Sequence, residues 1–260
     1  MQGILMSEVI LCVTEGEGVE YKILSNLERL FITNQKSVQI VPVCLNIYNF
    51  FQILTNDEDF GSEFLDTFEV IKEVCKKQTQ SMNAQFLQLP RSKVDQIYMF
   101  FDYDGHDTLA PKYPNCISDM LKLFNDETGN GKLYISYPMV ESYKHPISSI
   151  ETYPIFLPPH YKTFVGQTCD KHLNQISKIT KEQWLDIFYN HIMVSNFLIF
   201  DDFAFPNDYS VVGSLNQLDL YLNQESKFII PQNKVAVLNS FTLYLLEYLG
   251  IALFEELKQV

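Results

Sequence analysis

The sequence predicts an α/β fold: a mostly parallel sheet flanked by helices, followed by a helical C-terminal extension. Strand-like and helix-like segments alternate over the first 145 residues, which is the pattern of parallel strands joined by crossover helices. Hydrophobic residues make up 47% of the 260 residues, enough apolar surface for a full core. We expect an α/β domain over residues 1–145 and a mainly helical part over residues 146–260.

Local periodicity predicts the elements of the first part. The run from Val9 to Thr14 is apolar and predicts a strand, whereas apolar residues between Val19 and Phe31 recur at helical spacing. The run that ends at Asp102 is apolar at successive positions, as in a central strand buried on both faces. In order, we expect strands at 9–14, 38–45, 97–101 and 132–137, helices at 19–31 and 115–125, and a helical insert at about 47–77.

The pattern changes after residue 145. Four prolines between residues 146 and 159 predict a linker-like crossing. Thr180 and Gln183 form a capping-box pattern, which predicts a helix running past Trp184 towards Phe200. We also expect a helix at 211–222, a short β-like run at 234–238, and a closing helix at 241–257 that packs back on the sheet or on the helical part.

Composition narrows the possible functions. The net charge of −13 is unusual for a protein that holds nucleic acid by itself, because such a protein needs a basic face. For a polyanionic substrate, metal ions or a basic partner would have to supply the positive charge. The five scattered cysteines include no CxxC pair and no signal-peptide pattern precedes them, which predicts reduced thiols in the cytoplasm. The apolar runs are too short or too polar to span a bilayer, so we expect no membrane association.

The segment from Ile97 to Asp107, IYMFFDYDGHD, carries the first chemical motif. Asp102 and Asp104 directly follow the apolar run, and Gly105 lets the chain turn away. Open α/β sheets bind ligands beyond the carboxyl ends of their strands. Paired carboxylates there suit a hard divalent cation such as Mg²⁺ or Mn²⁺. On this segment alone, a solvated Asp/Gly turn is the commoner explanation.

A second acid at another strand end strengthens the prediction of a metal site. Glu15 follows the 9–14 strand and precedes Gly16. In a parallel sheet, Glu15 would share one edge with Asp102 and Asp104. Such a site suits phosphodiester cleavage, because one ion lowers the pKa of an attacking water while another stabilises the leaving oxygen. Without cations, the clustered carboxylates repel one another and their pKa values rise.

These motifs resemble the TOPRIM domain of topoisomerases, primases and OLD-type nucleases. The run Glu15–Glu20, EGEGVE, resembles the E-G-x-x-[ST]-E opening of the RloB-like branch, with Val19 in place of Ser or Thr. The run Ser136–Glu141, SYPMVE, is similar to the S-N-P-x-x-E segment after the fourth strand of that branch, with Tyr137 in place of Asn. The resemblance covers residues 7–145 and does not extend to the helical part that follows.

The resemblance implies a Mg²⁺- or Mn²⁺-dependent endonuclease that hydrolyses phosphodiester bonds in DNA or RNA, tRNA included. It implies metal binding by Asp102 and Asp104, with Glu15 as a ligand or general base and Glu20 and Glu141 as accessory acids. Stand-alone TOPRIM proteins of this size resemble the toxic effectors of bacterial anti-phage, abortive-infection systems, in which an ABC- or AAA-type ATPase partner controls the nuclease. A homo-oligomer is compatible with this expectation.

Basic side chains near the acids are further candidates. Lys144, three residues after Glu141, would stabilise the charge that builds up on a scissile phosphate. The alternative is that Lys144 and His145 form an ordinary surface basic pair. Lys162 and Lys171 could supply phosphate contacts from the helical part.

Two other functions stay open at this point. A non-catalytic binding module would keep the TOPRIM fold and use its acidic crevice for a metal, a nucleotide or a basic partner surface, and the departures at Val19 and Tyr137 favour it. A phosphatase or phosphotransferase would require a D-x-D-x-T pattern, whereas His106 stands at the position of the threonine. No G-x-x-x-x-G-K-[ST] phosphate loop occurs, so the chain is not an ATPase by that route.

Overall fold

The computed structural model describes residues 9–32, 36–57, 65–78, 83–156, 158–213 and 215–260. Its main sheet has the strand order β2-β1-β3-β5-β4. The first four strands of that order are parallel, and the short strand β4 runs antiparallel at the edge. The predicted α/β class is therefore confirmed. The strands are β1 (Val9–Thr14), β2 (Ser37–Pro42), β3 (Val94–Asp102), β4 (Asn125–Asp126) and β5 (Gly131–Ser136).

Strands β1 and β3 lie at the centre of the sheet because their side chains are apolar on both faces. Every residue of β1 is buried, and so is the β3 run Ile97–Phe101. A parallel sheet covered by helices on both faces needs such continuous apolar strands. The register pairs Thr14 with Phe100, so the carboxyl ends of the two central strands lie side by side.

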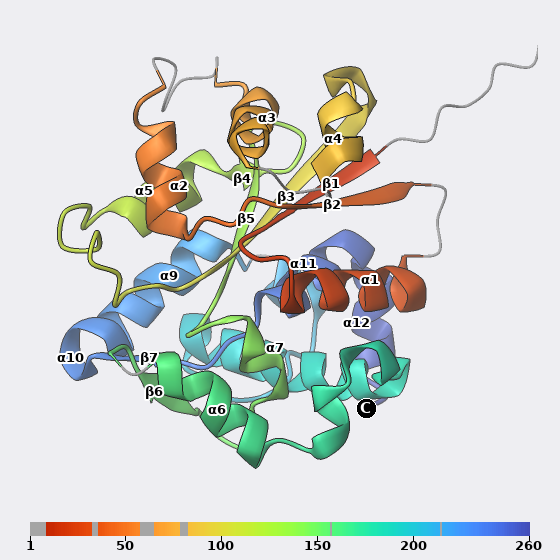
Figure 1. Ribbon diagram of the computed structural model, residues 1–260. Helices are drawn as coiled ribbons and strands as arrows, with labels where there is room; N and C mark the ends of the chain where they lie inside the picture. Colours follow the sequence, from red (N-terminus) through yellow and green to blue (C-terminus); the bar gives the residue numbers. More distant parts are fainter. Residues whose placement is uncertain (1–8, 33–35, 58–64, 79–82, 157, 214) are drawn as a thin grey trace, which may run out of the picture.

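Helices cover both faces of the sheet (Figure 1). In this view α2, α3 and α5 lie above it, and α1, α7 and α11 lie below. The expected insert at 47–77 contains α2 and α3, while residues 58–64 lie outside the described part. The side chain of Asn46 begins α2 by accepting the N–H of Asn49 at 2.9 Å. The helices of the first part are α1 (Val19–Phe31), α2 (Ile47–Leu54), α3 (Thr67–Lys77), α4 (Ala84–Gln88), η2 (Arg91–Lys93) and α5 (Cys116–Leu123).

The C-terminal part is mainly helical but also contains a small second sheet. Strand β6 (Thr152–Pro154) pairs antiparallel with β7 (Lys234–Ala236). Part of the expected linker at 146–159 is therefore a strand. Pro154 is tolerated there because it is the last residue of the strand, where a missing N–H costs little. The remaining elements are η3 (Val140–Lys144), α6 (Pro158–Thr168), η4 (Lys171–Asn174), η5 (Ile176–Lys178), α7 (Lys181–Phe200), α8 (Tyr209–Gly213), α9 (Gln217–Gln224), the π-helix η6 (Glu225–Ile229), α10 (Ile230–Gln232), α11 (Ser240–Leu249) and α12 (Ile251–Leu257).

The predicted start of α7 is confirmed, whereas two other predicted helices are divided. Thr180 and Gln183 form both hydrogen bonds of the capping box. The helix expected at 241–257 ends at Gly250, whose φ of 62° turns the chain between α11 and α12. The helix expected at 211–222 is likewise α8 followed by α9.

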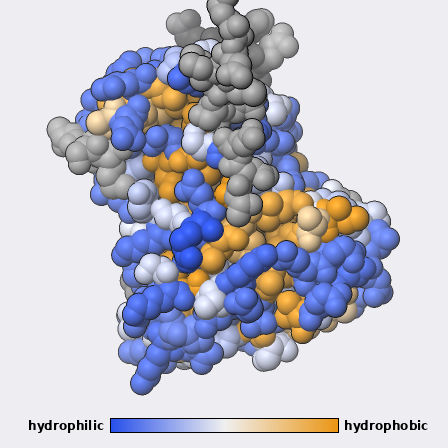
Figure 2. Space-filling model, turned by 90° about the vertical axis from the view of Figure 1, so that its right-hand side faces the viewer, coloured by the Kyte–Doolittle hydropathy of each residue, from blue (hydrophilic) through white to orange (hydrophobic). Residues whose placement is uncertain are grey.

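Buried residues on both sides of residue 145 form one hydrophobic core. Helix α11 packs on the sheet: the ring centroids of Phe100 and Phe241 are 4.6 Å apart, and those of Tyr98 and Tyr244 are 4.8 Å apart. In the described part of the chain, no helix has the length and apolar character needed to cross a membrane. On the side that carries the end of α1, hydrophobic surface gathers across the middle of the face and hydrophilic surface lies below it (Figure 2).

Candidate active site

Three strand ends bring five carboxylates to one edge of the sheet. Glu15 directly follows β1, Asp102 ends β3, and Asp104 lies two residues further on. Glu20 lies in the first turn of α1, and Glu141 lies in η3, shortly after β5. Because β1, β3 and β5 are parallel neighbours, their carboxyl ends lie at the same edge of the sheet. The five acids predicted from the sequence therefore lie in one region of the fold.

Hydrogen bonds hold Glu15 and Asp102 in place. The N–H of Glu15 donates to the carbonyl of Phe100 at 3.1 Å, which extends the β1–β3 pairing by one residue. Oε2 of Glu15 then accepts the N–H of Asp102 at 3.2 Å. Oδ1 of Asp102 accepts the N–H of Val140 at 2.7 Å. The end of β3 is thus tied to β1 on one side and to η3 on the other.

The spacing between Glu15 and Glu20 has a structural reason. The chain turns through Gly16 into α1, and the N–H of Gly16 donates to Oε1 of Glu20 at 3.1 Å. A Cβ atom at Gly16 would lie 3.3 Å from that same oxygen, which is tighter than ordinary van der Waals contact. Glycine therefore lets the carboxylate of Glu20, only 8% exposed, fold back towards the strand end.

Burial and neighbouring charges raise the pKa values of Glu15, Glu20, Asp102 and Asp104. Burial raises the pKa of Asp102 well above its usual range, and Glu15, Glu20, Asp104 and Glu141 raise it further. Burial, followed by the charge of Asp104, raises the pKa of Glu15 to about 9. Burial raises the pKa of Asp104 to about 6, although His106 opposes the shift. Without a cation, the cluster therefore holds protons at neutral pH.

A lysine of the helical part contacts the cluster. Nζ of Lys162, on α6, lies 2.9 Å from Oε1 of Glu141. The side chain of Glu141 is 3% exposed and that of Lys162 is 65% exposed, so the pair consists of a buried acid and a cation open to solvent. Hydrogen bonding to Glu141 and its negative charge raise the pKa of the Lys162 ammonium.

The side chain of Lys144 contacts Asn174 and Tyr143 rather than the acids. Its Nζ donates to Oδ1 of Asn174 at 3.1 Å and lies over the ring of Tyr143. The cation that contacts Glu141 is Lys162 instead, which the sequence offered only as a possible phosphate contact. The sequence gives little indication of this contact, because 21 residues separate Lys162 from Glu141. Only the path of α6 in the folded chain brings the two side chains together.

The loop after Asp104 places two further polar side chains near the cluster. Asp107 accepts hydrogen bonds from Nδ2 of Asn46 at 2.6 Å and from the N–H of Leu109 at 2.7 Å, so it organises the loop. Nδ1 of His106 lies 4.0 Å from Oδ1 of Asp104. The sequence did not single out Asn46, which follows β2 at the same sheet edge and connects α2 to this loop.

The chemistry of the donors fits a hard divalent cation, but their present geometry is not a complete ligand set. Carboxylate oxygens are the ligands that Mg²⁺ and Mn²⁺ prefer, and burial together with neighbouring acids raises the pKa values of Glu15 and Asp102. In the described part of the chain, however, no three Asp, Glu, His or Cys side chains already form a group that could hold one ion. Backbone N–H groups and Lys162 engage several of the oxygens. Metal binding would therefore require the carboxylates to move closer together around the ion.

Comparison of the chain with protein-family models, with curated proteins and with solved structures gives no match.

Proposed function

We propose that the protein is a Mg²⁺- or Mn²⁺-dependent nuclease of the TOPRIM type that hydrolyses phosphodiester bonds in DNA or RNA. One observation carries the proposal: Glu15, Asp102 and Asp104 meet at adjacent strand ends, with Glu20 and Glu141 beside them. Buried acids that raise one another's pKa values, gathered at the carboxyl edge of a parallel sheet, are typical of functional sites rather than of structural turns.

The acids and Lys162 take different roles in this proposal. Asp102, Asp104 and Glu15 would bind the ions, with Glu20 and Glu141 as accessory ligands. A bound ion would lower the pKa of the attacking water and stabilise the leaving oxygen. With the ions bound, the carboxyl of Glu15 would be ionised and able to accept a proton from that water. Lys162 would place its exposed ammonium against a nonbridging phosphate oxygen.

Substitution of the central acids tests the proposal. We expect Glu15→Gln and Asp102→Asn to lose at least 100-fold of the cleavage rate on single- and double-stranded DNA and RNA in Mg²⁺ or Mn²⁺. Asp126→Asn is the control, because Asp126 lies on β4 at the far edge of the sheet and binds Thr128. If both site variants cleave at the wild-type rate, the acids do not form the active site.

The second candidate is a binding module without catalysis. One observation favours it: hydrogen bonds and the Lys162 ion pair already engage carboxylates of the cluster. Such a module would use its acidic crevice to dock a basic partner surface. Calorimetry with Mg²⁺ or Mn²⁺ separates the candidates, because the nuclease should bind ions in the wild-type chain and lose them in Asp102→Asn, whereas the docking module should bind none.

The negative net charge of the chain agrees with a nuclease that depends on a partner protein for access to its substrate. With a net charge of −13, the free protein would attract a polyanion weakly. An ABC- or AAA-type ATPase that presents substrate would confine cleavage to the activated complex, as expected for the effector of an anti-phage system. Affinity purification followed by mass spectrometry tests this, and recovery of the chain without any ATPase would count against it.

A further inference from the structure

A cavity of about 530 Å³ lies between η3, η4 and α7. This volume falls within the usual range for sites that take small organic groups, about 300–1,000 Å³. Ile147, Leu173 and Ile187 supply apolar wall. Hydrogen-bonding side chains complete the lining: Lys144, Asp170, His172, Gln183, Asp186 and Asn190.

The cavity neighbours the acid cluster along η3. Glu141 and Lys144 are three residues apart on this 3-10 helix, so their side chains lie on the same side, separated by a rise of about 6 Å. Glu141 belongs to the cluster and Lys144 lines the cavity. Helix α6 makes the same connection, since Lys162 contacts Glu141 and Thr168 lines the cavity. One nucleotide can bridge such a separation.

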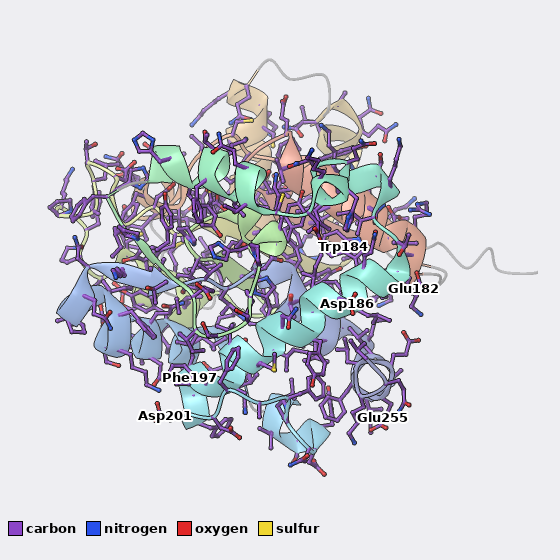
Figure 3. All side chains as sticks on the ribbon, turned by 90° about the horizontal axis from the view of Figure 1, so that it is seen from below. Glu182, Trp184, Asp186, Phe197, Asp201 and Glu255 are labelled. Carbon is purple, nitrogen blue, oxygen red and sulfur yellow. The ribbon has the colours of Figure 1, made fainter. Side chains whose placement is uncertain are left out.

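Several polar groups of the cavity are available to a ligand. Within the described residues, the side chains of Asp170, His172, Asp186 and Asn190 form no hydrogen bond with the protein. Asp186 lies in the first half of α7, near Trp184 (Figure 3). Two carboxylates would repel a phosphate but accept hydrogen bonds from amino and imino groups, as Asp does from the amino group of cytosine. The lining therefore suits a nucleobase, with Lys144 at its phosphate.

The segment 144–181, which supplies part of the cavity lining, carries a local excess of positive charge. Residues 144–181 contain five lysines and two acids, whereas the whole chain carries a net charge of −13. Lys144 and Lys162 both lie in this segment, one at the cavity and one at the acid cluster. A polyanion approaching the protein would be drawn to this segment and towards the site.

We propose that the cavity binds an unpaired base of the nucleic-acid substrate, next to the phosphate that the acid cluster cleaves. This inference rests on the proposed nuclease function and specifies its substrate class. The base carries an exocyclic amino group, as guanine and cytosine do. It has to be unpaired, because a base inside a duplex cannot enter a pocket without leaving the stack. The substrate is therefore a single strand or a loop.

Binding of defined oligonucleotides tests the pocket. The full chain carrying Asp102→Asn is titrated against fluorescently labelled oligouridine, and against the same strand with one central guanosine or cytidine, in RNA and DNA forms. We expect the single guanine or cytosine to raise the affinity at least fivefold. Asp186→Asn and Asn190→Ala, each added to Asp102→Asn, should abolish this preference. Glu255→Gln, on α12 and outside the cavity lining, should retain it.

The outcomes separate the pocket from the nuclease. If no oligonucleotide shows a base preference, or if Asp186→Asn and Asn190→Ala retain it, the pocket proposal is wrong even where the wild-type chain cleaves. If the preference is present but the wild-type chain never cleaves, the pocket stands and the nuclease assignment fails. If free GMP or CMP binds but the oligonucleotides show no base preference, the cavity is a site for free nucleotides. That result would overturn the proposal that the cavity binds a base of the nucleic-acid substrate. Circular dichroism establishes that each variant is folded.

Discussion

Asp102 is the residue that connects the acid cluster to the fold. Its N–H binds Glu15, and its Oδ1 accepts the N–H of Val140. Burial and the neighbouring acids oppose its ionisation. The backbone thus orients a carboxylate whose charge destabilises the folded chain, which is the balance expected of a site selected for function rather than for stability.

The first prediction is that Asp102→Asn stabilises the metal-free protein while abolishing cleavage. The amide keeps an oxygen that can accept the N–H of Val140. It does not titrate, so the folded chain no longer bears the cost of a buried carboxyl whose ionisation is opposed by burial and by the other acids. We expect the free energy of unfolding at pH 8 to rise by about 1–2 kcal/mol, or a few degrees in Tm. Thermal unfolding in EDTA measures it.

Asp126→Asn is the matched control for that prediction. Asp126 is exposed, and hydrogen bonds from Thr128 lower its pKa. Its amide variant should show no gain in stability. If Asp102→Asn unfolds at or below the wild-type temperature, the carboxylate is not repelled as inferred.

The second prediction concerns the ion pair of Lys162 and Glu141. Lys162→Ala leaves a carboxylate that is 3% exposed without its cation, which should destabilise the fold by about 1–2 kcal/mol at pH 7. Adding Glu141→Gln should recover most of the loss, because no buried charge is then left unpaired. Urea unfolding of the two single variants and the double variant gives the coupling energy, and additive effects would show that the contact contributes nothing.

At the scale of elements, the junction of β3 and β5 tolerates no side chain at Gly131. Its φ is +107°, and a Cβ atom there would lie 3.1 Å from Cγ2 of Ile97 and 3.2 Å from Cε of Met99. We therefore predict that Gly131→Ala costs about 2–4 kcal/mol. Gly166→Ala is the control, because a Cβ in that turn of α6 meets nothing within 4 Å and should stabilise the helix by about 0.5–1 kcal/mol. Equal unfolding midpoints for the two variants would contradict this account.

The elements that the sequence predicted well are those whose signal is local. The apolar run of β1 and the capping box at Thr180 need no information from distant residues. Strand β6 was missed because its partner β7 lies about 80 residues further along the chain, and prolines obscured its pattern. The break at Gly250 was missed because the apolar residues continue on both sides of it.

The candidate site likewise contains contacts that the sequence predicts and contacts that it does not. Glu15 and Asp102 could be predicted to meet because both follow apolar strands, and parallel strands share an edge. The contact of Lys162 with Glu141 could not, because it depends on how α6 crosses η3 in the folded chain. Lys144 was the nearer cation in sequence, yet Asn174 holds it at the neighbouring cavity. Sequence distance was therefore a poor guide where a helix from the C-terminal part completes the site.

At the scale of the whole molecule, His191 and the acids of the site make stability depend on pH in opposite directions. Burial, followed by the charge of His145, lowers the pKa of His191 to about 3 from an ordinary 6.5. The unfolded chain therefore binds the extra proton, and His191 destabilises the fold as the pH falls from 6.5 to 3. The acids of the site act in the opposite sense. Because their pKa values are raised, the folded chain holds the extra protons, and stability falls as the pH rises.

The last prediction concerns the loss of stability that the acids cause as the pH rises above neutral. Burial and Asp104 raise the pKa of Glu15 from 4.5 to about 9, so between these values each pH unit lowers the free energy of unfolding by up to about 1.4 kcal/mol for this group. Allowing for partial relaxation, we expect metal-free protein to lose about 1–2 kcal/mol between pH 7 and pH 9 in urea unfolding. Glu15→Gln should remove most of that loss, since its amide does not titrate. Mg²⁺ should reduce it in the wild-type chain only, because a cation stabilises the ionised acids. Equal stability of the wild-type chain at pH 7 and pH 9 in EDTA would mean that the acids are already compensated, and would favour the docking module over the nuclease.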